Sequence, residues 1–98
     1  MQVVLLATAY VVRAGTGNCD AYTSRTADGS RADYGVVAVS PHQFRFGTKF
    51  RIPGYGVAIA HDTGGDIHYG RMDVAMLSCR AAFAWGARTV KVDVLADR

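Results

Sequence analysis

The stretch 57-VAIAHDTGGDIHYGRMDVAM-76 decides the fold class of this chain. Residues 57–62 form a mostly apolar run, a Thr-Gly-Gly break follows at 63–65, and residues 71–76 alternate between polar and apolar side chains. A short apolar run and a period of two both predict β-strands, and glycines mark the break between them. The stretch therefore predicts two strands joined by a glycine-rich loop, which indicates a mainly β fold.

Outward from this stretch, strand signals recur in both directions. Apolar, β-branched runs predict strands at residues 2–12 and 36–39, and alternation predicts another at 89–95. A further strand at 49–52 ends at the turn signal Pro53-Gly54-Tyr55-Gly56. The count reaches about six short strands.

One short helix accompanies the strands. Ser78 is a favoured N-cap residue and Gly86 a common stop, so residues 79–85 predict a helix. A chain of 98 residues makes one domain, residues 1–98. Closure into a barrel is favoured because it removes exposed strand edges. We therefore expect a small six-stranded β-barrel with one helix.

The charge balance restricts the choice of partner. The net charge is +3, which fits an ordinary basic surface or attraction to a polyanion such as nucleic acid or a bacterial wall. The densest basic stretch, Arg45 to Arg51, has neither the aromatic interleaving of a single-strand binder nor a nucleic-acid motif. We expect no nucleic-acid partner.

The apolar start, Met1 to Val12, is too short to span a bilayer. It also lacks the basic beginning of a signal peptide, since its first charged residue is Arg13. We therefore expect no membrane insertion and no signal peptide in this chain.

Neither the cysteines nor the histidines predict a metal or cofactor site. Cys19 and Cys79 are too few to define a scaffold, and nothing in their spacing compels a bond, so we expect them to be unbonded. His42, His61 and His68 are scattered, and no C-x-x-C or H-E-x-x-H spacing occurs. The sequence predicts no metal and no cofactor.

Three carboxylates, Asp62, Asp66 and Asp73, cluster around the glycine loop. Cleavage of a glycosidic bond needs one carboxylic acid to protonate the leaving oxygen and another group to stabilise the sugar cation. Asp62 and Asp66 could instead brace the loop through backbone contacts. Asp73 lies between apolar Met72 and Val74, where burial would be costly without a partner. We expect Asp62 and Asp73 to lie about 5–9 Å apart and to face one groove.

Short motifs follow one another along nearly the whole chain. They are residues 7–10 (ATAY), 26–29 (TADG), 35–39 (GVVAV) followed by Pro41, 46–48 (FGT), 52–56 (IPGYG), 62–65 (DTGG), 71–73 (RMD), 84–86 (AWG) and 89–92 (TVKV). In this order and spacing they resemble the 3D domain, a family of bacterial cell-wall proteins named for three aspartates. The family is related to the barrel of membrane-bound lytic transglycosylase A.

The resemblance implies a six-stranded double-psi β-barrel and lytic transglycosylation. That reaction cleaves the MurNAc–GlcNAc β-1,4 bond of peptidoglycan and leaves a 1,6-anhydro-MurNAc end. The family's catalytic acid, which then acts as the base, carries over to Asp73, and its neighbouring aspartate to Asp62. The implied partner is the peptidoglycan glycan strand. The implied location is the cell wall, periplasm or exterior, and a phage lysis protein fits as well.

The chain departs from the family pattern at two places. Ser40 stands where the family has its first aspartate, which puts activity in doubt if that aspartate is required. One carboxylic acid can serve both steps, however, when the sugar's own 6-hydroxyl is the nucleophile. The loop sequence at 66–70 (DIHYG) also moves a glycine by one position and adds a carboxylate and an imidazole.

Several further residues are candidates for lining a sugar groove. Thr8 and Tyr10 share a strand face, although Tyr10 fits core packing equally well. Tyr55 could stack on a sugar or brace its turn. We expect Phe83 and Trp85 to be core residues. The substrate-binding candidates are Thr8, Tyr10, Thr63, Gly64, Gly65, Asp66 and Tyr55.

Two rival functions stay open. Double-psi barrels include family 45 endoglucanases, which use two aspartates on β-1,4-glucan with inversion. The dense disulfide set expected of such an enzyme is absent from this sequence. A non-catalytic wall-binding or partner-binding module is the second rival, and Ser40 is the residue that favours it.

Overall fold

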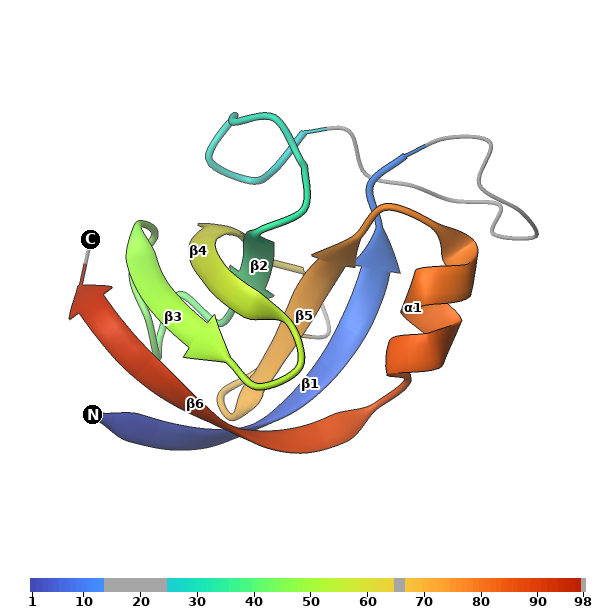
Figure 1. Ribbon diagram of the computed structural model, residues 1–98. Helices are drawn as coiled ribbons and strands as arrows, with labels where there is room; N and C mark the ends of the chain where they lie inside the picture. Colours follow the sequence, from blue (N-terminus) through green and yellow to red (C-terminus); the bar gives the residue numbers. More distant parts are fainter. Residues whose placement is uncertain (14–24, 65–66, 98) are drawn as a thin grey trace.

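The computed structural model describes residues 1–13, 25–64 and 67–97 (Figure 1). Its strands and helix follow one another as β1 (Gln2–Val11), β2 (Val36–Val39), β3 (Thr48–Ile52), β4 (Gly56–Asp62), β5 (Arg71–Met76), α1 (Cys79–Trp85) and β6 (Arg88–Asp97).

The strands close into a barrel in the order β1-β5-β2-β4-β3-β6. β1 runs parallel to β5, and β2 runs parallel to β4. The other neighbouring strands are antiparallel. Parallel partners cannot be joined by a hairpin, so long connections link strands that are distant in sequence. The predicted mainly β, six-stranded barrel with one short helix is confirmed.

Alternation along the strands fills the barrel. In β3, Thr48, Phe50 and Ile52 are buried whereas Lys49 and Arg51 are exposed. Successive side chains of a strand point to opposite faces, so one set packs inside and the other meets solvent. The fully buried centre is made of Leu5, Val37, Val39, Phe50, Ile52, Met72, Val74 and Val92.

Helix α1 covers one side of β1 and β5. The Ser78 hydroxyl accepts a hydrogen bond from the Ala81 N–H at 3.0 Å, which caps the helix as predicted. Trp85 is buried and its indole N–H donates to the Ala7 carbonyl at 3.1 Å. Phe83 is 76% exposed, so its prediction as a core residue is wrong. Two residues span about 200° of a helix, which turns Phe83 away from the face that Trp85 buries.

Cys79 is disulfide-bonded, so the expectation of unbonded cysteines is wrong. The sequence contains one other cysteine, Cys19, which lies outside the described residues. Cys79 is buried at the first turn of α1. Pairing of this kind depends on how closely the fold brings two Cα atoms together, and sequence spacing does not carry that information.

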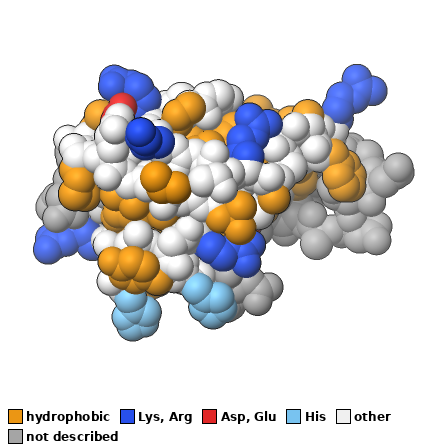
Figure 2. All heavy atoms as spheres, turned by 90° about the horizontal axis from the view of Figure 1, so that it is seen from below, with side chains coloured by type: hydrophobic (Ala, Val, Ile, Leu, Met, Phe, Trp, Pro, Cys, Tyr) orange, Lys and Arg blue, Asp and Glu red, His pale blue; other side chains and the backbone are white. Residues whose placement is uncertain are grey.

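The outer surface of the barrel carries basic and apolar side chains together. On the face shown in Figure 2, Lys and Arg side chains surround hydrophobic ones, and acidic side chains are scarce. Val4, Val57 and Leu95 are among the exposed apolar residues. Within the described ranges, no helix has the length and apolar character needed to cross a membrane.

Candidate active site

Strand register places the two predicted carboxylates in one row across four strands. Thr8 of β1 pairs with Asp73 of β5, Asp73 pairs with Ala38 of β2, and Ala38 pairs with Asp62 of β4. Met72 and Val74 point into the core, so Asp73 between them points outward. The row therefore lies on the outer face of the barrel wall, with the small Ala38 between the two carboxylates.

A β-bulge turns Asp62 onto this face. Val37 pairs with Ala60, but Ala38 pairs with Asp62, so His61 is an extra residue on β4. Val37 and Ala60 both point into the core. Without the extra residue, strict alternation would direct Asp62 inward as well. A bulge re-aims a side chain in this way and is common beside active sites.

Both carboxylates line one pocket of about 200 Å³. Its lining residues are Tyr10, Ala38, Asp62, Thr63, Gly64, Ile67 and Asp73. A second pocket of about 250 Å³ is lined by Met1, Gln43, Phe44, Arg45, Thr48 and Val94, and thus has no acidic side chain. Acid catalysis needs a proton donor, so the pocket between Asp62 and Asp73 is the candidate site.

Asp62 is held in place by backbone donors. Its Oδ1 accepts the N–H of Ala27 and the N–H of Thr63, both at 2.9 Å. The Tyr10 hydroxyl donates to its Oδ2 at 3.4 Å. Only 7% of Asp62 is exposed, so these bonds replace the water that a buried carboxylate would otherwise lack. The orientation of Asp62 is therefore fixed from three sides.

Asp73 has a different environment. Burial raises its pKa above the ordinary aspartate value, and the charge of Asp62 raises it further. A hydrogen bond from the Thr8 hydroxyl to Oδ1, at 2.9 Å, and the charge of Arg71 both act to lower the pKa. Burial prevails, so Asp73 keeps its proton to a higher pH than an ordinary aspartate does.

Tyr10 is a neutral donor in the same pocket. Burial raises the pKa of its hydroxyl, and the charges of Asp62 and Asp73 raise it further. The phenol consequently stays protonated at physiological pH and acts as a hydrogen-bond donor to nearby acceptors. Its position beside both carboxylates supports its prediction as a pocket residue.

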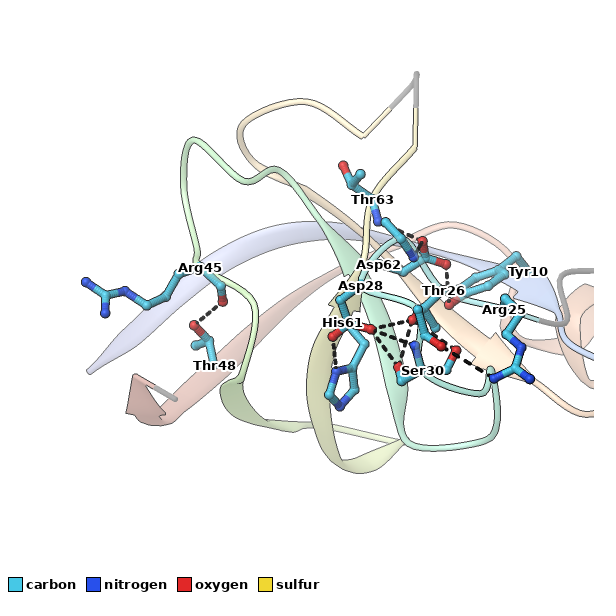
Figure 3. A network of polar contacts seen from close by, with 12 residues as sticks. Tyr10, Arg25, Thr26, Asp28, Ser30, Arg45, Thr48, His61, Asp62 and Thr63 are labelled. Carbon is cyan, nitrogen blue, oxygen red and sulfur yellow. Dashed lines mark hydrogen bonds and ion pairs between the residues drawn. The ribbon is translucent and has the colours of Figure 1, made fainter.

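The loop carrying the TADG motif reaches across to the end of β4 (Figure 3). The Asp28 N–H donates to the His61 carbonyl at 3.1 Å, and His61 Nδ1 contacts Asp28 Oδ2. The adjacent Ala27 supplies one of the two backbone donors to Asp62. The loop thus clasps the bulged end of β4 and positions the carboxylate there.

Asp28 organises this loop from within. Its Oδ1 accepts hydrogen bonds from the Thr26 hydroxyl and from both the N–H and the hydroxyl of Ser30. Burial alone would raise the pKa of Asp28, but the combined hydrogen bonds from Thr26, Ser30 and His61 hold it well below its ordinary value. Asp28 is thus a turn residue and also an anchor for the site.

The pocket contains most of the predicted site residues. Tyr10, Asp62, Thr63, Gly64 and Asp73 line it directly. Thr8 contacts it through its hydrogen bond to Asp73. Gly65 and Asp66 lie outside the described residues.

Tyr55 is a correction to the predicted site. Its ring is buried, stacks on Tyr34 with 4.3 Å between ring centroids, and meets the edge of Trp85. Its hydroxyl donates to the Ala75 carbonyl at 2.7 Å and accepts the Gly35 N–H at 2.7 Å. Tyr55 does not line the pocket, because core packing and buried hydrogen bonds occupy its ring and its hydroxyl. Tyr55 braces its turn, which was the alternative prediction for this residue.

Sequence reasoning missed Ala27, Ala38 and Ile67. Ala38 and Ile67 line the pocket, and Ala27 contributes through a backbone N–H that any residue except proline could supply. Small and apolar residues of this kind carry no chemical signature in a sequence. No cluster of three potential metal-ligating side chains occurs in the part of the chain that the structure describes.

Comparison with known proteins places this geometry in a family. The family model of the 3D domain matches residues 35–96, which include Asp62 and Asp73. The chain belongs to the 3D domain family. Two relatives come from Bacillus subtilis (strain 168). YabE, named for cell wall shaping, is 36% identical over 84 residues, 82% of this chain.

The second relative is the cell wall-binding protein YocH, 45% identical over 60 residues, 61% of this chain. Each match covers 21% of the relative, so the 3D domain described here spans about a fifth of either protein. The YabE match is long enough to extend beyond residues 35–96.

Proposed function

We propose that this 3D domain acts on the bacterial cell wall as a peptidoglycan lytic transglycosylase. The observation that carries the proposal is the row of Asp62 and Asp73 on one wall of one pocket, with burial raising the pKa of Asp73. The names of the two relatives, which refer to cell wall shaping and cell wall binding, support the cell wall as its location and as its partner. Glycan strands as the specific partner follow from the proposed reaction.

In the proposed reaction, Asp73 performs both proton transfers. Its carboxylic acid donates a proton to the glycosidic oxygen as the bond from that oxygen to C1 of MurNAc breaks. The 6-hydroxyl of the same MurNAc then bonds to C1, and its proton passes to the Asp73 carboxylate. The products are a 1,6-anhydro-MurNAc end and a free GlcNAc 4-hydroxyl, and Asp73 regains its starting state.

The other pocket residues have supporting roles. Asp62, held by backbone donors, places negative charge opposite the sugar cation that forms at C1. Tyr10 donates a hydrogen bond to Asp62 and Thr8 donates one to Asp73, and each bond helps to orient its carboxylate. The reaction as written requires no group besides these side chains.

Mass spectrometry of the products tests this reaction. Purified protein incubated with peptidoglycan should release muropeptides that end in 1,6-anhydro-MurNAc, with no new reducing ends. New reducing ends would instead indicate hydrolysis, as in the endoglucanase-like alternative, and would contradict lytic cleavage.

A non-catalytic wall-binding module is the second candidate. The name of YocH and the serine at position 40 favour it. A binding module would sediment with insoluble peptidoglycan and leave the turbidity of the suspension unchanged. Sedimentation together with release of anhydro-muropeptides would exclude this alternative.

A further inference from the structure

Arg71 lies beside the proposed acid on the same face of the barrel. It precedes Asp73 by two positions on β5, and the intervening Met72 points into the core. Residues two apart in a strand share a face and lie about 7 Å apart. Arg71 also pairs with Leu6 of β1, whose side chain is 38% exposed. The guanidinium therefore borders the row that contains Asp73.

The Nε of Arg71 lacks an acceptor at a buried position, although the residue as a whole is half-buried. Its Nε is buried and has no hydrogen-bond partner among residues 1–13, 25–64 and 67–97. A buried N–H without an acceptor is unfavourable, and native structures contain few of them. The positive charge of Arg71 acts to lower the pKa of Asp73. The hydrogen bond to the Asp73 carboxylate, however, comes from the Thr8 hydroxyl. Within the described residues, no hydrogen bond therefore holds the Arg71 Nε.

The residue that directly follows β2, on the side where Arg71 lies, supplies no charge. β2 and β5 are antiparallel, and Val39 pairs with Met72. Ser40, the residue after Val39, therefore lies opposite Arg71, the residue before Met72. Ser40 is 3% exposed. Its hydroxyl is small and uncharged, which leaves the positive charge of Arg71 unneutralised on this side.

We propose that Arg71 binds a carboxylate of the glycan substrate next to the acid. This inference rests on the proposed function, since it assumes a glycan in the Asp62–Asp73 pocket. A guanidinium presents parallel N–H donors that match the two oxygens of a carboxylate. Two sources of this group exist in peptidoglycan. One is the lactyl carboxylate of MurNAc in strands without stem peptides, and the other is a carboxylate of an intact stem.

Titration calorimetry tests the site, with turnover blocked by Asp73→Asn. The probes are chitotetraose, which has no carboxylate, and GlcNAc–MurNAc tetrasaccharides with and without stem peptides. Arg71→Met keeps the length of the side chain and removes its charge and donors. We expect it to weaken binding of one carboxylate-bearing probe about 10- to 100-fold, the range for a hydrogen bond to a charged group. Its affinity for chitotetraose should not change.

Ser40→Asp is a second variant that does not alter Arg71. It places a carboxylate of the chain next to the guanidinium, and we expect a similar loss of affinity for the same probe. Loss with the stem-free probe assigns the lactyl carboxylate, and loss with the intact probe assigns the stem. Circular dichroism confirms that each variant is folded.

The inference is overturned if both folded variants bind the carboxylate-bearing probes as tightly as the Asp73→Asn protein does. It is also overturned if their affinity for chitotetraose falls as much as their affinity for those probes. Failure of the proposed reaction would look different. In that case wild-type protein would release no anhydro-muropeptides, whatever the dependence of binding on Arg71.

Discussion

At the scale of single residues, Asp62 and Asp73 illustrate how one residue type acquires two different environments within one pocket. Asp62 accepts two backbone N–H bonds and is almost fully buried. Asp73 accepts one side-chain hydrogen bond, and burial raises its pKa. The sequence identified both aspartates through their spacing around a glycine loop. Spacing alone could not show which is the better proton donor, because that depends on neighbours from β1 and from the TADG loop. The expectation that Asp73 is the acid came from the family resemblance.

We expect Thr8 to set the pH range over which Asp73, the proposed acid, is active. Its hydroxyl favours the charged form of Asp73, so Thr8→Val should raise the pKa of Asp73 further. A general acid is active while protonated, and activity falls as pH rises through its pKa. The falling limb of the pH profile for anhydro-muropeptide release should therefore move to higher pH in Thr8→Val. Thr8→Ser retains the donor and should keep the wild-type profile. A limb that stays in place or moves to lower pH in Thr8→Val would contradict this role.

The same pKa shift affects stability. Because the folded chain holds the Asp73 proton more tightly than the unfolded chain, this residue's stabilising contribution is present at low pH. It is lost as pH rises from the ordinary aspartate value through the raised pKa. Paired carboxylates with lowered pKa values, such as Asp28, follow the opposite trend.

At the scale of elements, apolar runs, alternation and capping predicted all six strands and the helix, with ends that differ by at most two residues. The predicted ranges 36–39, 71–76 and 79–85 match β2, β5 and α1. The bulge at His61 was not predicted, because it is a property of the pairing between β4 and β2. The register between strands that are distant in sequence leaves no pattern in the local sequence. The orientation of Asp62 depends on that bulge.

The TADG loop should matter for both stability and activity. Asp28→Ala removes the acceptor that Thr26, Ser30 and His61 share, so we expect a loss of about 1–3 kcal/mol in the free energy of unfolding. Activity should fall too, because Ala27 then holds Asp62 less firmly.

Urea denaturation and muropeptide release measure the two effects. Asp33→Ala is the matched control, since Asp33 is exposed, pairs with Arg13 and accepts the Tyr34 N–H, and its loss should lower the denaturation midpoint less than Asp28→Ala does. If Asp28→Ala matched this control in both measurements, the loop would not anchor the site.

At the scale of the whole molecule, barrel closure and the disulfide act together. A 98-residue domain has a limited core, so a covalent link contributes a large share of its stability. Reduction of the Cys79 disulfide should lower the free energy of unfolding by about 2–4 kcal/mol. Urea denaturation with and without reductant measures this change, and Cys79→Ser should be insensitive to reductant. A wild-type midpoint unaffected by complete reduction would contradict the prediction.

The overall architecture could be predicted because strand patterning and motif order agree along the chain. The placement of Phe83 and Tyr55 could not, because it depends on which side of an element the rest of the barrel covers. Ser40 was noted as a departure in sequence, but its consequence for Arg71 became visible only through the pairing of β2 with β5.

The most direct test of the central claim compares wild-type protein with Asp73→Asn on purified peptidoglycan, with 1,6-anhydro-muropeptides quantified by mass spectrometry. Asparagine keeps the shape of the side chain and removes its acidic proton. We predict that the folded variant releases these products about 10²- to 10⁴-fold more slowly, the range attributed to general acid–base catalysis, and that Asp62→Asn has a smaller effect. Release at the wild-type rate by a folded Asp73→Asn protein would contradict the assignment of Asp73 as the acid.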